Sequence, residues 1–219
     1  KRGLIRSTAR LPRREKILLY QGGFAPDRGL EVLVAAAEHL EYGWTLVLMG
    51  SGKLEPRLRA VTQRINERGG GRRTPRVVML PPAPHHELLR WTSEATVGVI
   101  AYEPNCLNHI YCSPNKLWEY PSAGVPILAT PLVEVAAAIR TSGCGWIVND
   151  PSPYAIADQV NRLSKADIRS ARLGCAVFLE QNNWGIHAGR LVDRYSELEG
   201  QSSSAPPLHA SGKQACEQW

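Results

Sequence analysis

Short apolar runs alternate along this chain with longer stretches in which apolar residues recur every three or four positions. The runs predict buried strands over residues 16–21, 45–49, 76–80, 96–101, 126–129 and 146–148. The stretches predict helices over residues 28–40, 54–68, 85–94, 133–141, 154–163, 167–178 and 184–198, with one short helix opening near residue 115. Strands that alternate with helices at this spacing need right-handed crossovers. The pattern therefore predicts an α/β fold with a doubly wound parallel sheet of about six strands.

The same pattern divides the chain into three parts. Residues 16–199 carry the periodic apolar positions, and 219 residues with 43% hydrophobic content suit one folded domain. Residues 1–15 precede the first strand and are expected to form a basic, solvated linker or arm. Residues 200–219 are rich in Ser, Pro and Gly without periodic apolar positions, so a disordered tail is expected there.

The net charge of +6 comes from the arm, whose basic residues are Lys1, Arg2, Arg6, Arg10, Arg13 and Arg14. Without these six residues the chain holds 20 basic and 20 acidic residues. Nucleic-acid binding is not expected, because no basic stripe with interleaved aromatic residues occurs on the domain. Attraction of the arm to anionic lipid, and so a peripheral membrane association, is an alternative to the linker.

Cysteine usage and hydropathy favour the cytoplasm, with the membrane surface as an alternative. The five cysteines are odd in number and form no C-x-x-C pair, so neither a disulfide framework nor a zinc site is expected. No apolar stretch approaches the ~20 residues of a membrane span, and no secretory signal opens the chain. The first residue is Lys, so we expect a fragment or a processed chain.

Three connections that follow strands carry the candidate site. They are the turn at Gly22 and Gly23, the loop that starts at Leu80, and the loop 113–116. In doubly wound sheets, ligands bind beyond the carboxyl ends of the strands. All three connections should therefore meet at one edge of the sheet and form a single site.

The first connection has the chemistry of a phosphate site. Gly22 and Gly23 allow close approach of the backbone, and Arg28 at the start of the next helix can pair with phosphate oxygens. A plain tight turn with a solvated Arg28 is the alternative.

The run 113–129 offers both halves of a nucleoside-diphosphate site. The loop from Ser113 leads into a helix start at Asn115 and Lys116, where backbone N–H groups and the Lys116 ammonium can bind phosphate. Leu117 follows, and the Glu119 carboxylate one turn later can accept hydrogen bonds from two sugar hydroxyls. The alternatives are a simple helix cap with an exposed Lys116, and a Glu119 that faces solvent.

This run closely resembles the donor-binding motif of group 4 type retaining glycosyltransferases, which have the GT-B fold of two facing Rossmann-like domains. The resemblance covers residues 16–198 and implies the C-terminal, donor-binding domain. It implies that Gly22, Gly23, Arg28, Leu80, Ser113, Asn115, Lys116, Leu117 and Glu119 bind a nucleotide-sugar, with Glu119 on the ribose. It also implies transfer to a hydroxyl acceptor with retention, without a metal or other cofactor. Trp184 and Tyr195 resemble aromatic residues of the closing helix in this family, where packing is expected.

Two positions depart from the family pattern. Gly23 stands where a second basic residue is usual, so Arg28 is the only basic residue of the first loop. Tyr111 stands where the family's paired-Glu motif has its first acidic residue, eight positions before Glu119. The sugar, the base and the acceptor are therefore not predicted.

Several alternatives stay open. The acceptor-side groups are expected in an N-terminal domain or a partner chain, without which this chain should be inactive. It could instead be half of a split glycosyltransferase or a non-catalytic nucleotide-sugar-binding module. A nucleotide-sugar epimerase is a weaker alternative, because the sequence offers few candidate acids or bases. A receiver domain is disfavoured because Leu80-Pro81-Pro82, without Asp, ends the third strand. His85, His86 and Glu87 lack the spacing of H-E-x-x-H, so no metal site is expected.

Overall fold

The computed structural model describes residues 4–69 and 73–202 of the chain. The chain divides into two compact units, Lys1–Glu180 and Gln181–Trp219. The first unit contains the whole sheet and all the residues predicted for the site. None of the helices in the described residues combines the length and the apolar character needed to cross a membrane.

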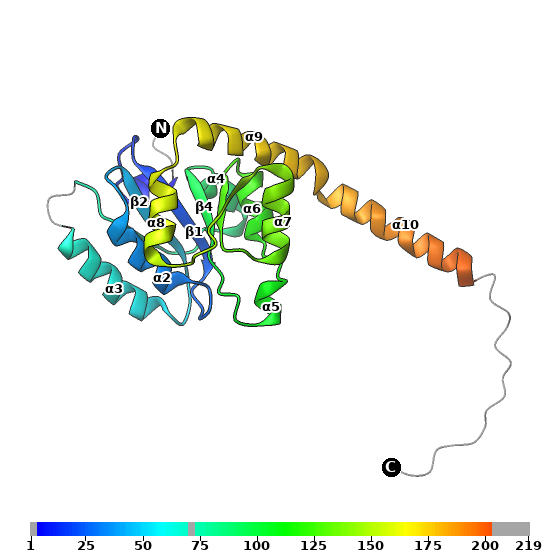
Figure 1. Ribbon diagram of the computed structural model, residues 1–219, viewed down its shortest axis with the longest axis horizontal. Helices are drawn as coiled ribbons and strands as arrows, with labels where there is room; N and C mark the ends of the chain where they lie inside the picture. The colour runs from blue at the N-terminus through cyan, green and yellow to red at the C-terminus, as the bar shows by residue number, and fades with distance from the viewer. Residues whose placement is uncertain (1–3, 70–72, 203–219) are drawn as a thin grey trace, which may run out of the picture. The chain divides into compact units, whose positions relative to one another are not determined.

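The sheet of the first unit has six parallel strands, which confirms the predicted fold class (Figure 1). The spatial order is β3-β2-β1-β4-β5-β6. The chain therefore reverses its direction of travel across the sheet between β1 and β4, where ligands bind in such folds. The strands are β1 (Lys16–Gly23), β2 (Trp44–Ser51), β3 (Val77–Leu80), β4 (Val97–Ile100), β5 (Ile127–Ala129) and β6 (Gly145–Ile147).

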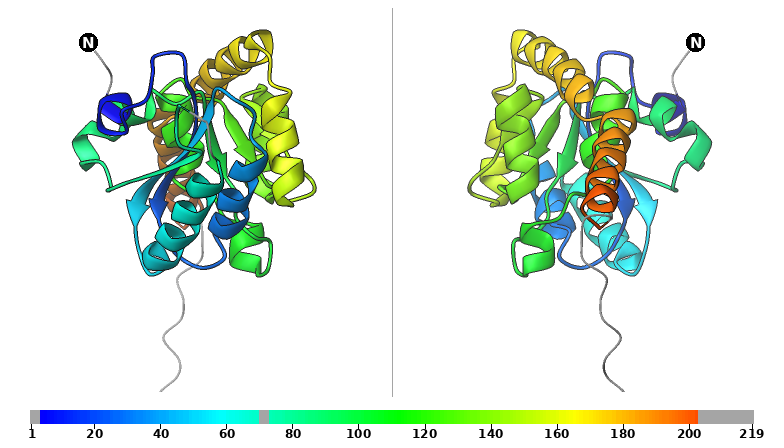
Figure 2. Two further views of the ribbon diagram at one scale, coloured as in Figure 1. Left: turned by 90° about the vertical axis from the view of Figure 1, so that its left-hand side faces the viewer. Right: turned by 90° about the vertical axis from the view of Figure 1, so that its right-hand side faces the viewer.

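Helices cover both faces of this sheet, as the two views of Figure 2 show. The α2 face is covered by α2 (Leu30–Ala36), the 3₁₀ turn η1 (Ala37–His39), α3 (Glu55–Arg68) and α8 (Pro153–Asn161). The α6 face is covered by α1 (Leu4–Thr8), α4 (Leu88–Thr92), α6 (Lys116–Ser122), α7 (Val133–Ser142) and the C-terminal part of α9 (Lys165–Gln181), while Ile168 of α9 packs in the core of the α2 face. The 3₁₀ turn η2 (His85–Glu87) precedes α4, and α5 (Leu107–Ile110) is a short helix that the pattern did not predict.

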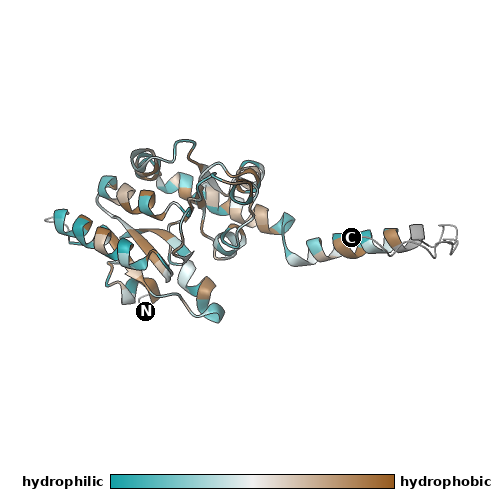
Figure 3. Cartoon of the chain, turned by 90° about the horizontal axis from the view of Figure 1, so that it is seen from below, coloured by the Kyte–Doolittle hydropathy of each residue, from teal (hydrophilic) through white to brown (hydrophobic). Residues whose placement is uncertain are grey.

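The apolar runs form strands because each strand is buried on both sides. Leu18 and Tyr20 of β1 pack toward the α2 face, while Ile17 and Leu19 pack toward the α6 face, and all four are fully buried. A strand between two helical layers has no solvent face, so its sequence is a continuous apolar run. In Figure 3 the strands are brown, and the helices around them alternate brown and teal.

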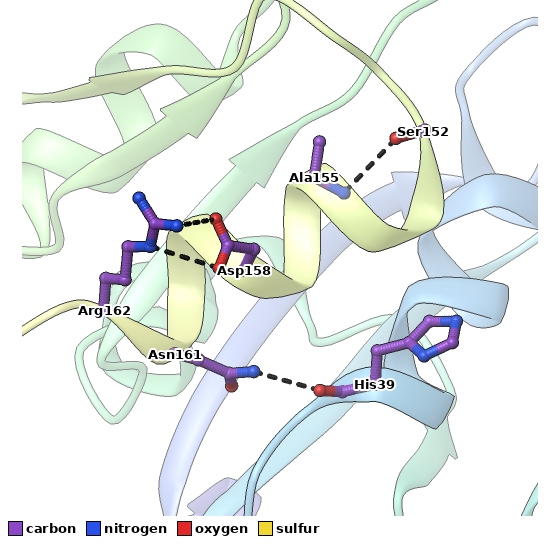
Figure 4. Close-up of polar contacts among 6 residues, drawn as sticks. All are labelled: His39, Ser152, Ala155, Asp158, Asn161 and Arg162. Atoms are coloured by element: carbon purple, nitrogen blue, oxygen red, sulfur yellow. Dashed lines mark hydrogen bonds and ion pairs between the residues drawn. The ribbon is translucent and has the colours of Figure 1, made fainter.

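Helix α8 is capped at its N-terminus and held beside η1 by polar contacts at its C-terminus (Figure 4). At the N-terminus, the Ser152 hydroxyl caps the helix and accepts a hydrogen bond from the Ala155 N–H at 3.3 Å. At the C-terminus, Asn161 Nδ2 donates to the His39 carbonyl at 3.0 Å, and Asn161 Oδ1 accepts from the Glu41 N–H at 3.0 Å. These contacts fix α8 beside η1.

The segment predicted as a solvated linker differs in the structure, because residues 4–15 pack on the domain. Ile5 of α1 and Leu11 are buried in the core of the α6 face. The N–H groups of Ile5 and Arg6 donate to the Glu94 carboxylate at 3.1 and 3.0 Å. The Arg6 guanidinium donates to the carbonyls of Pro12 and Glu15. Burial of the two apolar side chains stabilises this packing, while the basic residues Arg10, Arg13 and Arg14 stay exposed.

The C-terminal boundary also differs from the predicted domain of residues 16–199. Helix α10 (Trp184–Ser202) lies in the second unit and extends past the predicted start of the tail at residue 200. Trp184 and Tyr195, for which packing was expected, are exposed on this helix. The remainder of the predicted tail, residues 203–219, lies outside the described residues.

Candidate functional site

The loops that follow β1 and β4 meet α6 at the carboxyl edge of the sheet and enclose a cleft of about 410 Å³. Seven of the nine residues predicted for the site line this cleft. They come from two of the three predicted connections, the turn after β1 and the loop that leads into α6. The lining consists of glycine backbone, basic groups, polar groups and one carboxylate: Gln21, Gly22, Gly23, Arg28, Tyr102, Asn108, Cys112, Ser113, Pro114, Asn115, Lys116 and Glu119.

The other two predicted residues lie elsewhere. Leu80 and Leu117 are buried in the core of the α6 face. Neither side chain lines the cleft, so the structure gives both side chains a packing role. The third predicted segment, after β3, instead borders a smaller cleft of about 170 Å³ through Pro82 and Ala83.

Two glycines allow the close packing at this edge. Gly22 has φ of 120°, and a Cβ there would lie 3.1 Å from Lys116 Nζ. Gly29 has φ of 66°, and a Cβ there would lie 1.9 Å from the Ala101 carbonyl oxygen. Both backbone conformations are ones that side-chain-bearing residues rarely adopt. The glycines therefore let the Lys116 ammonium lie against β1 and let α2 start against the end of β4.

Lys116 is the most buried cation of the cleft, with 7% of its surface exposed. Its Nζ donates to the Tyr102 hydroxyl at 3.2 Å and lies 4.9 and 5.1 Å from the ring centroids of Tyr20 and Tyr102. The pKa of Lys116 is lowered from 10.5 to about 8, mainly by burial, with the attraction of Glu119 opposing this shift and the repulsion from Arg28 adding to it. The alternative of an exposed Lys116 is wrong.

Arg28 lies half-buried and contacts the same tyrosine. Its guanidinium carbon is 4.1 Å from the ring centroid of Tyr102, so this ring contacts both cations of the cleft. Burial raises the pKa of the Tyr102 hydroxyl, against the opposing effect of Arg28. Within residues 4–69 and 73–202, neither Arg28 nor Lys116 forms an ion pair with a carboxylate. The cleft therefore presents two cations that an anionic ligand can neutralise.

Glu119 lies at the junction of three clefts. It lines the 410 Å³ cleft, the 170 Å³ cleft with Met49 and Leu88, and a third cleft of about 340 Å³ with His85 and His86. Its Oε2 accepts a hydrogen bond from Gln21 Nε2 at 2.7 Å. The side chain is half-buried and directed at the clefts, so the alternative of a Glu119 that simply faces bulk solvent is wrong.

Tyr111, which replaces the first acidic residue of the motif, does not line the cleft and is 60% exposed. Five lining residues were not predicted for the site, and two of them, Gln21 and Tyr102, form hydrogen bonds with the predicted residues Glu119 and Lys116. Gln21 is a polar residue near the carboxyl end of an apolar strand, and Tyr102 follows the apolar run of β4. A polar or aromatic side chain at the end of a buried strand was the available signal.

In the part of the chain that the structure describes, no three His, Cys, Asp or Glu side chains are grouped as a metal site. Cys106, Cys112, Cys144 and Cys175 are free thiols. Cys216 lies outside this part of the chain.

The sequence profile described as "Glycosyl transferases group 1" matches residues 15–166, more than half of the chain. The chain belongs to the group 1 glycosyltransferases. The match includes every residue predicted for the site.

Two curated relatives illustrate the similarity. The D-inositol 3-phosphate glycosyltransferase of Xylanimonas cellulosilytica is 25% identical over 198 residues, covering 90% of this chain and 46% of that protein. The enzyme of the same name from a Nocardioides species is 26% identical, covering 91% of this chain and 46% of its own length. The chain therefore spans about half the length of the curated relatives it matches.

Solved structures share the fold over a similar part of their chains. Sucrose-phosphate synthase from Thermosynechococcus elongatus superposes with a TM-score of 0.67 at 25% identity, covering 90% of this chain and 48% of that one. The trehalose 6-phosphate synthase of Burkholderia multivorans superposes with a TM-score of 0.72 at 14% identity, covering 92% and 46%. Anabaena Alr3699/HepE in complex with UDP-glucose gives 0.68 at 13% identity, covering 84% and 49%.

Proposed function

We propose that this domain binds the nucleoside-diphosphate part of a nucleotide-sugar in the 410 Å³ cleft and forms the donor half of a retaining glycosyltransferase. The observation that carries this proposal is that the Glu119 carboxylate lines the same cleft as the cations Arg28 and Lys116. A nucleoside diphosphate has groups that match these, with a ribose diol beside two phosphates. Family membership supports this proposal independently of the geometry.

Arg28 and Lys116 would contact the diphosphate. An Arg guanidinium can bind phosphate oxygens in a forked geometry, while a buried ammonium acts as a compact point charge. The exposed backbone at Gly23, where an added Cβ would meet no atom within 4 Å, leaves room for a ligand to approach. During transfer these fixed charges would stabilise the negative charge that develops on the leaving diphosphate, so the proposal includes no metal requirement.

Glu119 would bind the ribose hydroxyls. With Oε2 already accepting from Gln21, the carboxylate retains acceptor capacity on Oε1 for a diol. The 170 Å³ cleft on its far side has mainly apolar neighbours, Met49, Pro82, Ala83 and Leu88, and would receive the part of the nucleoside beyond the ribose.

The acceptor side would come from a second domain or a partner chain. The chain matches about half of each relative, and besides the two cations the titratable side chains that line the cleft are Glu119, Cys112 and Tyr102. The residues that line this cleft, all within the described part of the chain, include no histidine, which favours transfer over epimerisation. The exposed position of Tyr111 supports the second candidate, a nucleotide-sugar-binding module without turnover.

Calorimetric titration of the full chain tests the proposal. UDP, UDP-glucose, GDP and ADP should be titrated with and without Mg²⁺, and at least one should bind below millimolar in both conditions. Glu119→Ala should weaken that binding by about 1–3 kcal/mol, the range for charge-assisted hydrogen bonds, with little loss of thermal stability. Glu134→Ala is the matched control, because Glu134 is also in the first turn of a helix but is exposed and away from the cleft.

Two results would contradict the proposed function. One is the absence of sub-millimolar binding for every nucleotide. The other is a Glu119→Ala variant that melts at a clearly lower temperature but keeps its nucleotide affinity, since this would make Glu119 a structural residue of α6.

A further inference from the structure

A chain of buried hydrogen bonds leads from α4 through β1 to the Glu119 carboxylate. The Thr92 hydroxyl of α4 donates to Gln21 Oε1 at 2.7 Å, and Gln21 Nε2 donates to Glu119 Oε2 at 2.7 Å. Thr92 is 0% and Gln21 2% exposed. Both distances are within the usual range for such hydrogen bonds, and the two bonds connect three separate elements of the fold.

The hydrogen atoms in this series of hydrogen bonds have one consistent arrangement. An ionised carboxylate only accepts hydrogen bonds, so Gln21 must present its NH₂ group to Glu119 and its carbonyl oxygen to Thr92. The Thr92 hydroxyl then has to donate toward Gln21, although the Leu88 carbonyl at 2.8 Å offers it a second acceptor. The Gln21 amide is thus orientated by Thr92 on one side and Glu119 on the other.

The backbone of Gln21 is fixed as well. Its N–H donates to the Tyr120 hydroxyl at 3.3 Å, and that hydroxyl also contacts the carbonyls of Leu19 and Val99 at 3.0 and 3.3 Å. Tyr120 is the residue after Glu119 and is fully buried. Gln21 therefore connects to α6 at two consecutive residues, which restricts both the helix and the Glu119 side chain.

We propose that Gln21 and Thr92 are positioning residues that hold the Glu119 carboxylate in one rotamer, and that this gives the site its selectivity for a ribose over a 2′-deoxyribose. The inference rests on the proposed function. Gln21 occupies Oε2, so Oε1 faces the ligand in a fixed direction. A carboxylate held in this way discriminates a sugar with two neighbouring hydroxyls from a sugar with one, because its geometry cannot adapt to the second. Neither Gln21 nor Thr92 needs to touch the nucleotide hydroxyls for this effect.

The test compares the affinities of UDP and 2′-deoxy-UDP, or of the corresponding pair for whichever nucleotide binds the wild-type chain. The wild-type chain should prefer the ribonucleotide by roughly tenfold or more. Thr92→Val keeps the shape of the side chain but removes the donor to Gln21, and Gln21→Met keeps its length but removes both hydrogen bonds. In both variants the preference should fall to within about threefold, close to that of Glu119→Ala.

Thr92→Ser is the matched control, because it restores the hydroxyl in a smaller side chain and should recover most of the preference. A merely structural role for Thr92 would lower the melting temperature without changing the ratio of the two affinities. The inference is overturned if Thr92→Val and Gln21→Met bind nucleotide and keep the wild-type ratio. It is also overturned if the wild-type chain binds both nucleotides equally. Absence of any nucleotide binding by the wild-type chain contradicts the proposed function itself and removes this inference with it.

Discussion

The stability of a Lys116 variant measures how much the buried, unneutralised ammonium of Lys116 destabilises the folded chain. This ammonium is buried beside two tyrosine rings, with Arg28 as a second cation on the same cleft. A binding site for an anion is expected to be destabilising while it is empty, because it concentrates charge of one sign. We therefore predict that Lys116→Met stabilises the folded chain in the absence of ligand, although it removes a residue of the proposed site.

The magnitude follows from the pKa. Lowering the pKa from 10.5 to about 8 corresponds to about 3 kcal/mol of free energy against the charged form in the folded chain. Methionine keeps a long unbranched side chain but loses the hydrogen bond to Tyr102 and the contacts with the two rings. These losses together amount to about 1–2 kcal/mol. The variant should therefore be more stable by about 1–2 kcal/mol near neutral pH.

The effect has a defined pH window. Because the folded-state pKa is lowered, the unfolded chain binds more protons than the folded chain between about pH 8 and pH 10.5. The stability of the wild-type chain consequently rises with pH through this window, relative to a variant that lacks the titrating group. The advantage of Lys116→Met should shrink by about 2 kcal/mol between about pH 7 and about pH 10.

Urea unfolding of the full-length chain and the variant at a series of pH values measures this difference. Comparison at equal pH cancels the titration of the other groups, and Lys165→Met, which changes an exposed lysine of α9, is the control. The variant should also bind the nucleotide at least roughly tenfold more weakly, since a charged contact to phosphate is lost. The reasoning is refuted if Lys116→Met is less stable than the wild-type chain near neutral pH, or if the difference stays constant across the series.

Two further predictions concern the packing of residues 4–15 and the activity of the chain alone. Ile5→Ala should destabilise the first unit by about 2–4 kcal/mol, because it leaves a cavity under α1. Arg13→Ala, at an exposed position, should change the stability little. If urea unfolding shows equal effects for the two variants, residues 4–15 act as the solvated linker that the sequence predicts. The chain alone should transfer no sugar to a hydroxyl at an enzymatic rate, because alignment of donor and acceptor contributes roughly 7–11 kcal/mol and the acceptor side is not expected here. Product formation from labelled nucleotide-sugars, with and without an added acceptor domain, measures this, and robust transfer by the chain alone would contradict it.

The errors in the predicted fold share one cause. The arm was interpreted from its charge, but Ile5 and Leu11 bury their side chains in the core of the α6 face, whose other members lie far along the sequence. Glu94 accepts from the first turn of α1 across about ninety positions of sequence, which no local pattern could reveal. Local patterns also could not reveal the boundary after Glu180. The apolar periodicity of α10 resembles that of a helix packed on the domain, but α10 belongs to a separate unit.

The sequence by itself determined the class of fold and most of the candidate site. Continuous apolar runs such as those of β1 and β2 are stable only between two helical layers, so the parallel sheet follows from local patterns. Parallel strands also direct their carboxyl ends to one edge, which is why Gly22, Arg28 and Lys116 were expected together.

Only the tertiary structure decided which side chains act at that edge and how. Whether Lys116 is exposed or buried depends on Tyr20 and Tyr102, and whether Glu119 has a partner depends on Gln21 and Thr92. Leu80 and Leu117 lie in the same segments as the lining residues but turn into the core. Side-chain burial and hydrogen bonding are set by neighbours from other elements, and these neighbours are known only when the chain is folded.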